Sequence, residues 1–245
     1  MCSGVNLSFQ RMSYRPHTDF IRLCRFCLLV FILGADDGWT ETFDVPRERL
    51  ASAGANPYFI LEPGYVLTFE GDSKGRKAAL VITVLDETKT VEGVETRIVE
   101  ERETIDGKPV EVSRNYLAID KQTKDVYYFG EDVDDYDKSG KVVGHGGAWH
   151  AGKDGARFGL IMPGEPKVGQ KYYQEIAPKR AMDRAEVIGL DETVKVPAGE
   201  FSKCLKTRET TPLEPDEREH KYYAPGVGLL IDGNLKLVKY GKQEK

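Results

Sequence analysis

Four aspartates and two histidines lie close together in the segment 131–150 (EDVDDYDKSGKVVGHGGAWH). Asp135, Asp137 and Ser139 match positions 1, 3 and 5 of an EF-hand calcium loop, and the residue after Ser139 is the glycine of position 6. Oxygens that alternate in this way can fold around one hard cation. Position 12, however, is Gly146, where calcium requires a bidentate glutamate. Calcium is therefore a possible cofactor, and a polar β-hairpin with solvated aspartates is the alternative.

The two histidines of this segment offer ligands for a transition metal. His145 and His150 flank Trp149, and Asp154 follows shortly after. Imidazole nitrogens bind zinc and copper, and glycines allow a loop to wrap around an ion. A structural zinc site needs four close ligands, and no cysteine lies nearby. A shared ion at His145 and His150 would also require the loop to bend sharply.

Catalytic motifs are absent from the sequence. It contains no G-x-S-x-G, H-E-x-x-H or P-loop pattern. Ser139, His145 and Asp154 could supply a hydrolytic triad only if the fold brought them together beside an oxyanion hole. Several glutamates could act as a carboxylate pair, but their spacing selects no two of them: Glu62, Glu70, Glu131 and Glu175.

Aromatic residues suggest a different kind of site. Tyr128, Tyr173 and Tyr223 each belong to a run of adjacent aromatic residues. Neighbouring residues of a strand point to opposite faces of the sheet, so one ring of each run is expected to face the core and one to face outward. Outward rings on a concave sheet would form an apolar platform for a hydrophobic ligand. Trp149 and Met162 lie in a long segment that could close over it.

Most of the chain after residue 64 alternates between apolar and polar residues. This period-2 pattern, with Gly and Asp turns at short spacing, predicts an all-β antiparallel fold. The expected strands are 65–69, 78–85, 94–103, 109–119, 125–129, 185–196, 203–209, 220–224, 229–232 and 235–240. A single curved sheet, either a half-barrel or a sandwich, fits this order of elements.

Helices and long loops are expected to be few. One or two short helices are predicted, at 46–53 and 179–184. The Gly- and Pro-rich segment 144–171 is expected to be a long irregular loop, and such loops often act as lids. The acidic segment 210–219 is expected to be an exposed loop. No linker divides residues 36–245, which we expect to form one domain.

The first 35 residues have the pattern of a secretory signal peptide. Four arginines precede the apolar run 26–33 (FCLLVFIL), and Gly34 and Ala35 precede a polar start. The run is shorter than the roughly 20 apolar residues of a permanent transmembrane helix. Cleavage is expected after Ala35, with either Met1 or Met12 as the start. The chain is therefore predicted to be exported to the periplasm or the medium, with no transmembrane helix in its mature part.

Charge content narrows the possible classes of partner, and cysteine content excludes an internal disulfide. The leader holds four of the 35 basic and one of the 40 acidic residues, which leaves 31 and 39 and a net charge of −8. Such a surface repels phosphate backbones, so nucleic acid is not an expected partner. Cys204 is the one cysteine beyond the leader, so no internal disulfide can form. We expect Cys204 to be a small core residue.

Two motifs resemble a recurring pair in uncharacterised exported bacterial β-rich proteins. They are VPAGEF at 196–201 and KYYAPGVGL at 221–229. The stretches at 56–71, 128–131 and 162–170 resemble one subgroup of the same proteins. The resemblance implies a curved half-barrel similar to periplasmic lipoprotein-carrier folds, and it implies no agreed activity. A fold alone does not determine an activity.

The sequence therefore favours an exported, non-catalytic binding protein that carries a hydrophobic or lipid-like small molecule in a concave β groove. The groove or lid residues would be Tyr128, Trp149, Met162, Tyr173 and Tyr223. The first alternative is a periplasmic metal-binding protein for calcium or a transition metal, with ligands Asp135, Asp137, Ser139, His145 and His150. A secreted hydrolase is the second alternative.

Overall fold

The computed structural model describes residues 38–243. The predicted signal peptide, both possible starts and the three leader cysteines lie outside the described residues. One 3-10 helix, η1 (Arg47–Arg49), precedes the strands. The strands are β1 (Leu50–Ala51), β2 (Gly54–Asn56), β3 (Phe59–Leu61), β4 (Tyr65–Ser73), β5 (Arg76–Val91), β6 (Val94–Ile105), β7 (Lys108–Asp120), β8 (Val126–Tyr136), β9 (Val142–Gly144), β10 (Trp149–His150), β11 (Arg157–Met162), β12 (Lys171–Tyr173), β13 (Glu175–Ile176), β14 (Arg184–Val196), β15 (Gly199–Thr211), β16 (Glu214–Ala224), β17 (Gly228–Asp232) and β18 (Leu235–Lys242).

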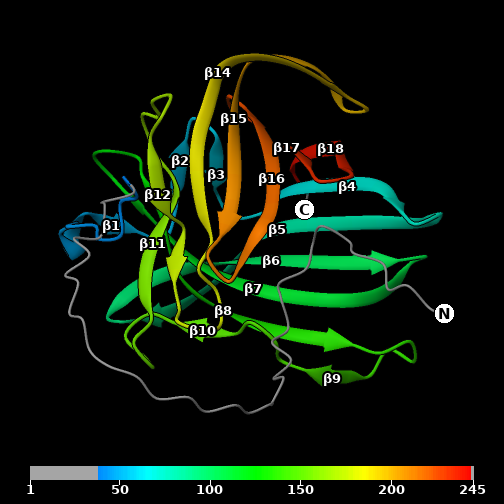
Figure 1. The fold of residues 1–245 in the computed structure, drawn as a ribbon, viewed down its shortest axis with the longest axis horizontal. Helices are drawn as coiled ribbons and strands as arrows, with labels where there is room; N and C mark the ends of the chain where they lie inside the picture. Colours follow the sequence, from blue (N-terminus) through cyan, green and yellow to red (C-terminus); the bar gives the residue numbers. More distant parts are fainter. Residues whose placement is uncertain (1–37, 244–245) are drawn as a thin grey trace, which may run out of the picture.

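Two antiparallel meanders make up one large sheet. The first runs from β4 to β8 and the second from β14 to β18, and pairing of β18 with β4 joins them. In Figure 1 the strands β14 to β16 run across the front of β4 to β8, so the sheet curves back over itself. The prediction of an all-β fold with one curved antiparallel sheet is thereby confirmed.

The short segment 171–176, which contains β12 and β13, brings the two ends of the sheet together. Its first half, β12, pairs with β14, while its second half, β13, pairs with β11 beyond β8. Gly159 on β11 permits the close approach, because a Cβ atom there would lie 2.4 Å from the carbonyl oxygen of Gln174. The sheet therefore nearly closes on itself.

The core gathers apolar side chains from both meanders. Phe69, Leu80 and Val99 from the first and Leu205 and Leu230 from the second are essentially unexposed. Each such side chain contributes roughly 1.5–3 kcal/mol when it is buried. Cys204 is fully buried and free, which confirms the prediction that it is a core residue.

The two sequence motifs form turns between strands. In the first, Val196 pairs with Gly199 across the β14–β15 turn, and Gly199 has a φ of 149°. Glycine adopts such a positive φ without steric cost. Phe201 then packs partly buried against the core, with its ring edge-on to Tyr240. In the second motif, Gly226 with a φ of 72° turns β16 into β17.

The helix predictions were largely wrong. Of the segment 46–53, residues 47–49 form a single 3-10 turn, and Leu50 already enters β1. Residues 178–180 form a turn, closed by the hydrogen bonds between Ala177 and Ala181, and Arg184 begins β14. Isolated helices this short are marginally stable in water, so turns and strand pairing replace them.

The two predicted loops were also wrong in part. Residues 214–219 of the acidic segment 210–219 belong to β16, which meets the end of β15 across a two-residue turn at 212–213. The segment 144–171 contains β10 and β11, and both pair with β8. Strands of two to six residues separated by glycine turns leave too short a period-2 pattern for sequence analysis to detect.

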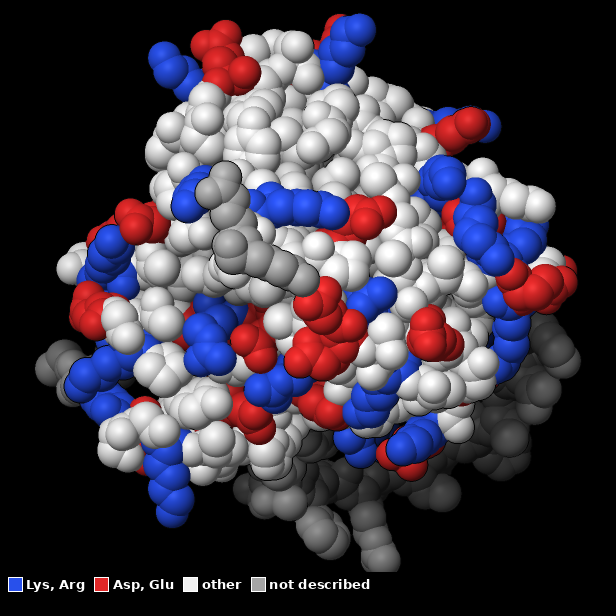
Figure 2. All heavy atoms as spheres, turned by 180° about the vertical axis from the view of Figure 1, so that it is seen from behind, with Lys and Arg blue, Asp and Glu red and all other residues white. Residues whose placement is uncertain are grey.

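Charged side chains of both signs are interspersed on the face seen in Figure 2. Several basic and acidic side chains pair across neighbouring strands, as Lys77 does with Glu70 and Arg114 with Asp134. Solvent-exposed pairs of this kind contribute at most about 1 kcal/mol each.

Candidate functional site

A pocket of about 220 Å³ opens beside Trp149. One wall comes from the turn between β10 and β11, and the other from the turn between β13 and β14. The lining residues are Ala148, Trp149, His150, Lys153, Asp154, Ala156, Ala177, Pro178 and Arg180. Six of these nine belong to the segment 144–171 that was expected to cover a binding site.

Strand β10 holds the first wall in place. Trp149 lies opposite Glu131 and His150 opposite Gly130 on β8. Gly130 has a φ of 143°, and a Cβ atom there would lie 2.5 Å from the carbonyl oxygen of Trp149. Glycine at this position therefore lets β10 lie directly on β8.

Trp149 forms the buried side of the pocket. Its ring packs edge-on against Tyr128, with the ring centroids 5.2 Å apart. The Tyr128 hydroxyl lies 2.6 Å from Asn115 Oδ1 and 2.8 Å from Glu131 Oε2. Among residues 38–243, no hydrogen-bond partner reaches the indole Nε1 of Trp149. The indole N–H is thus a buried donor without a partner, and its nitrogen has essentially no accessible surface.

His150, on the opposite face of β10, belongs to a polar network with three other side chains. Lys89 Nζ donates to the Tyr116 hydroxyl and to Asp132 Oδ2, each at 2.9 Å. The Tyr116 hydroxyl donates to Asp132 Oδ2 at 2.5 Å, and His150 Nε2 lies 3.1 Å from Asp132 Oδ1. The His150 ring also stacks on Tyr116, at 5.6 Å between centroids. The network ties β5, β7, β8 and β10 together.

The surroundings of this network fix its protonation state. Burial raises the pKa of Tyr116 to about 12, and the hydrogen bond to Asp132 adds to the effect. Burial and the nearby Lys89 ammonium lower the pKa of His150, so its imidazole is neutral at pH 7. Burial opposes ionisation of Asp132, but hydrogen bonds from Tyr116 and Lys89 hold its pKa below the ordinary value. Tyr116 is too deeply buried and too weakly acidic to give up its proton near neutral pH.

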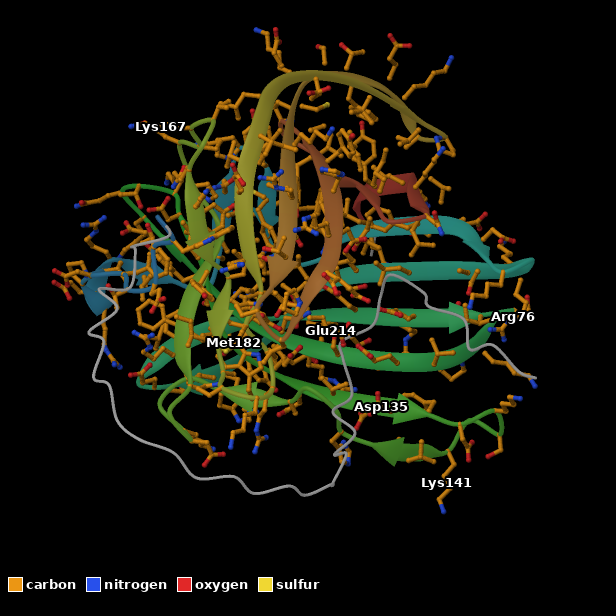
Figure 3. All side chains as sticks on the ribbon, in the orientation of Figure 1. Arg76, Asp135, Lys141, Lys167, Met182 and Glu214 are labelled. Carbon is orange, nitrogen blue, oxygen red and sulfur yellow. The ribbon has the colours of Figure 1, made fainter. Side chains whose placement is uncertain are left out.

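The five residues predicted to bind a metal are held by separate partners. Asp137 Oδ1 accepts hydrogen bonds from the backbone N–H groups of Ser139 and Lys141 and from Ser139 Oγ. Asp135 accepts one from the Gly146 N–H. Figure 3 shows Asp135 on β8 and Lys141 beyond the hairpin turn.

The two histidines also point to different partners. His145 lies 2.7 Å from the carbonyl oxygen of Val133 and 3.2 Å from Asp134, whereas His150 faces Asp132. In the described part of the chain, no group of three or more His, Cys, Asp or Glu side chains could hold a metal ion. The polar hairpin that the sequence left open as the alternative is formed by β8 and β9.

The residues considered for hydrolysis are likewise engaged elsewhere. Ser139 hydrogen-bonds Asp137, His145 contacts Asp134, and Asp154 pairs with Arg180. Three of the four glutamates have partners of their own: Glu70 pairs with Lys77, Glu131 contacts Tyr128, and Glu175 accepts a hydrogen bond from the Asp183 N–H.

The predicted groove residues lie in the core or at its edge. Tyr128, Trp149, Met162, Tyr173 and Tyr223 are all less than a tenth exposed. In the run 127–129 every ring is buried, since Tyr127 packs on Phe43 and Phe158 while Tyr128 packs on Trp149. Strand β8 is therefore covered on both faces, which alternation along the strand alone does not reveal.

A second polar cluster, which sequence analysis missed, lies on β15 to β17. Lys221 Nζ is 3.2 Å from Glu209 Oε2 and 3.6 Å from Asp232 Oδ1. Glu209 Oε1 also lies within 3.4 Å of Gln174, Thr207 and Tyr223. The nearby carboxylates raise the pKa of Lys221 well above its ordinary value despite burial. Burial raises the pKa of Glu219 to about 8, and Asp232 and Glu209 contribute to the rise.

Sequence signals for both polar groups were weak. In the first network, Lys89 and Asp132 are 43 residues apart, so only strand pairing brings them together. In the second, Glu219, Lys221 and Tyr223 recur at every other position and share one face of β16. Two charged residues and a tyrosine at alternate positions of one strand were the available signal.

Comparisons with known proteins found little similarity to this chain. No protein-family model and no curated protein matches the chain. A similar solved structure is that of a putative lipoprotein from Parabacteroides distasonis ATCC 8503. It has a TM-score of 0.37 and 15% identity, and the match covers 77% of this chain and 100% of that one. Between residues 38 and 243, no helix is long and apolar enough to cross a membrane.

Proposed function

We propose that the protein is an exported, non-catalytic binding protein and that its ligand binds in the Trp149 pocket. Export is supported by the basic n-region, the apolar run and the small residues that precede Asp36. Binding is supported by the pocket itself, which combines a buried aromatic wall with a few polar groups. Small-molecule sites typically have this composition.

The observation that carries the proposal is the pocket itself, which lies between two separate turns of the chain and has the buried side chain of Trp149 on its inner side. No comparable arrangement of nucleophile and base supports a catalytic role for the candidate triad residues, which are held by separate partners.

The size of the pocket favours a small ligand over a lipid. Sites for drug-sized ligands usually measure roughly 300–1,000 Å³. The volume of about 220 Å³ is below that range. The apolar part of the ligand would lie against Ala148, Ala156 and Ala177. A small molecule with one ring or a short aliphatic chain fits this description better than an acyl lipid.

Ligand-observed NMR with a library of small neutral, cationic and anionic fragments tests the proposal. We expect saturation transfer to some fragments, and we expect it to be lost in Ala148→Phe, where the added ring fills the pocket. Ala55→Phe is the matched control, because Ala55 is exposed on β2 and outside the pocket lining. If no fragment binds, or if binding survives in Ala148→Phe, the pocket is not the ligand site.

A further inference from the structure

The polar groups of the Trp149 pocket are mainly hydrogen-bond donors. The Trp149 side chain is only 3% exposed, and its Nε1 lacks a partner among the described residues. Lys153 adds an ammonium group at the pocket wall. Within residues 38–243, no carboxylate pairs with Lys153. Lys153 therefore offers an unpaired donor at the pocket wall, whereas the indole nitrogen of Trp149 is itself buried.

The remaining charged groups leave the lining positive. Arg180 pairs with Asp154 at 3.4 Å, and these two charges cancel. The Asp154 side chain is 80% exposed and that of Arg180 is 53% exposed, so solvent screens their attraction. Arg180 Nη1 also donates to the carbonyl oxygen of Ala148, at 3.0 Å, which holds the guanidinium against the pocket wall. With His150 neutral, Lys153 supplies the uncompensated charge.

We propose that the pocket binds a small organic anion, with its carboxylate or equivalent oxyanion held by the ammonium group of Lys153 and by the guanidinium group of Arg180. This inference rests on the proposed function and adds the chemical class of the ligand. The anion could also draw Arg180 away from its exposed pair with Asp154. The lining alanines and Pro178 would contact the carbon skeleton of the ligand.

The opposite charge class fits the pocket poorly. A cationic ligand would have to approach Lys153, and the one acidic side chain in the lining, Asp154, already pairs with Arg180. A neutral amide could accept a hydrogen bond from Lys153 or Arg180 but would lack the attraction between opposite charges. Discrimination between these ligands should therefore depend on charge as well as on shape.

Three probes of similar size that share a phenyl ring test the charge class: benzoate, benzamide and benzylamine. The chain has two tryptophans, so in a Trp39→Phe background the intrinsic fluorescence reports Trp149 alone. We expect benzoate to give a saturable change and to bind at least tenfold more tightly than benzamide or benzylamine at low ionic strength. Lys153→Gln should weaken benzoate binding at least fivefold, whereas Lys138→Gln, which removes an exposed charge on the β8–β9 turn, should not.

The possible outcomes separate this inference from the proposed function. Equal binding of all three probes, or tighter binding of benzylamine, would overturn the anion assignment while leaving a ligand pocket at Trp149. Unchanged benzoate affinity in Lys153→Gln would also overturn it. If none of the probes binds while the NMR fragment screen gives hits that Ala148→Phe removes, the anion class fails and the pocket stands. An empty fragment screen would contradict both.

Discussion

Asp132 contacts side chains from three other strands. Tyr116 on β7, Lys89 on β5 and His150 on β10 all meet its carboxylate. Each contact joins segments that are far apart in the chain, so the carboxylate acts as a cross-link between strands. Its effect also reaches the pocket, because His150 belongs both to the network and to the pocket lining.

Asp132→Asn should lower the free energy of unfolding by about 1–3 kcal/mol, because the Tyr116 hydroxyl and the Lys89 ammonium lose a charged acceptor. Urea denaturation followed by circular dichroism measures the change. Asp191→Asn is the control, since Asp191 is exposed on β14 and should change stability by less than about 0.5 kcal/mol. Equal stability of the Asp132 and Asp191 variants would show that the network does not stabilise the fold.

Glu219 should make the stability depend on pH. Burial raises its pKa from the ordinary value of 4.5 to about 8, so the folded state binds the proton more tightly than the unfolded chain does. Stability should therefore fall as pH rises from about 5 to about 8, because ionisation places a charge beside Asp232 and Glu209, which Lys221 only partly offsets. The effect should be on the order of 2 kcal/mol, since partial exposure and Lys221 screen the charge.

Glu219→Gln isolates this contribution. The variant has no carboxyl group to titrate at 219, so its stability should change less than that of the wild type between pH 5 and pH 8. Thermal unfolding across that range provides the measurement. Parallel pH profiles of the two proteins would mean that Glu219 titrates normally in the folded state.

At the scale of elements, long strands were predictable and their short neighbours were not. Strands β4 to β7 and β14 to β18 follow from alternation and apolar runs, because most of them bury one face more deeply than the other, while β17 and the end of β7 are buried on both faces. Strand β8 was predicted only as far as residue 129, whereas it continues to Tyr136 through four acidic positions. Those acidic side chains are accommodated by partners on other strands, such as Arg114 and His145 for Asp134. Sequence alone cannot supply these partners.

The contacts of the pocket residues could not be predicted from the sequence either. Trp149 and His150 were both singled out from the sequence, the first as part of a lid and the second as a metal ligand. Their strand pairing with β8 directs Trp149 to the pocket and the core, and His150 to Asp132. Lys153 and Arg180 come from separate turns, and no sequence pattern joins them.

Closure of the sheet depends on Gly159. Gly159→Ala should lower the free energy of unfolding by about 1–3 kcal/mol, because the new Cβ atom would overlap the backbone of Gln174. Gly146→Ala serves as the control, since its nearest neighbour is the flexible end of Asp135 at 3.3 Å. Chemical denaturation of both variants tests this. A loss no larger in Gly159→Ala than in the control would show that the two ends of the sheet can separate at little cost.

At the scale of the whole molecule, the proposed export would determine the form in which the protein acts. When the full chain is expressed in a bacterium, the exported protein should begin at Asp36, because Gly34 and Ala35 precede the polar start. Intact-mass spectrometry of the exported fraction measures the start directly. Recovery of the uncleaved chain from the cytoplasm alone would contradict export.

The central claim is that the exported protein binds a small ligand at Trp149. A crystal structure of that protein soaked with the fragments that bind in solution tests it most directly. We predict ligand density against Ala148, Ala156 and Ala177, with a polar group of the ligand within hydrogen-bonding distance of Lys153 or Arg180. Ligand density at another place, with the Trp149 pocket holding only water, would contradict the account.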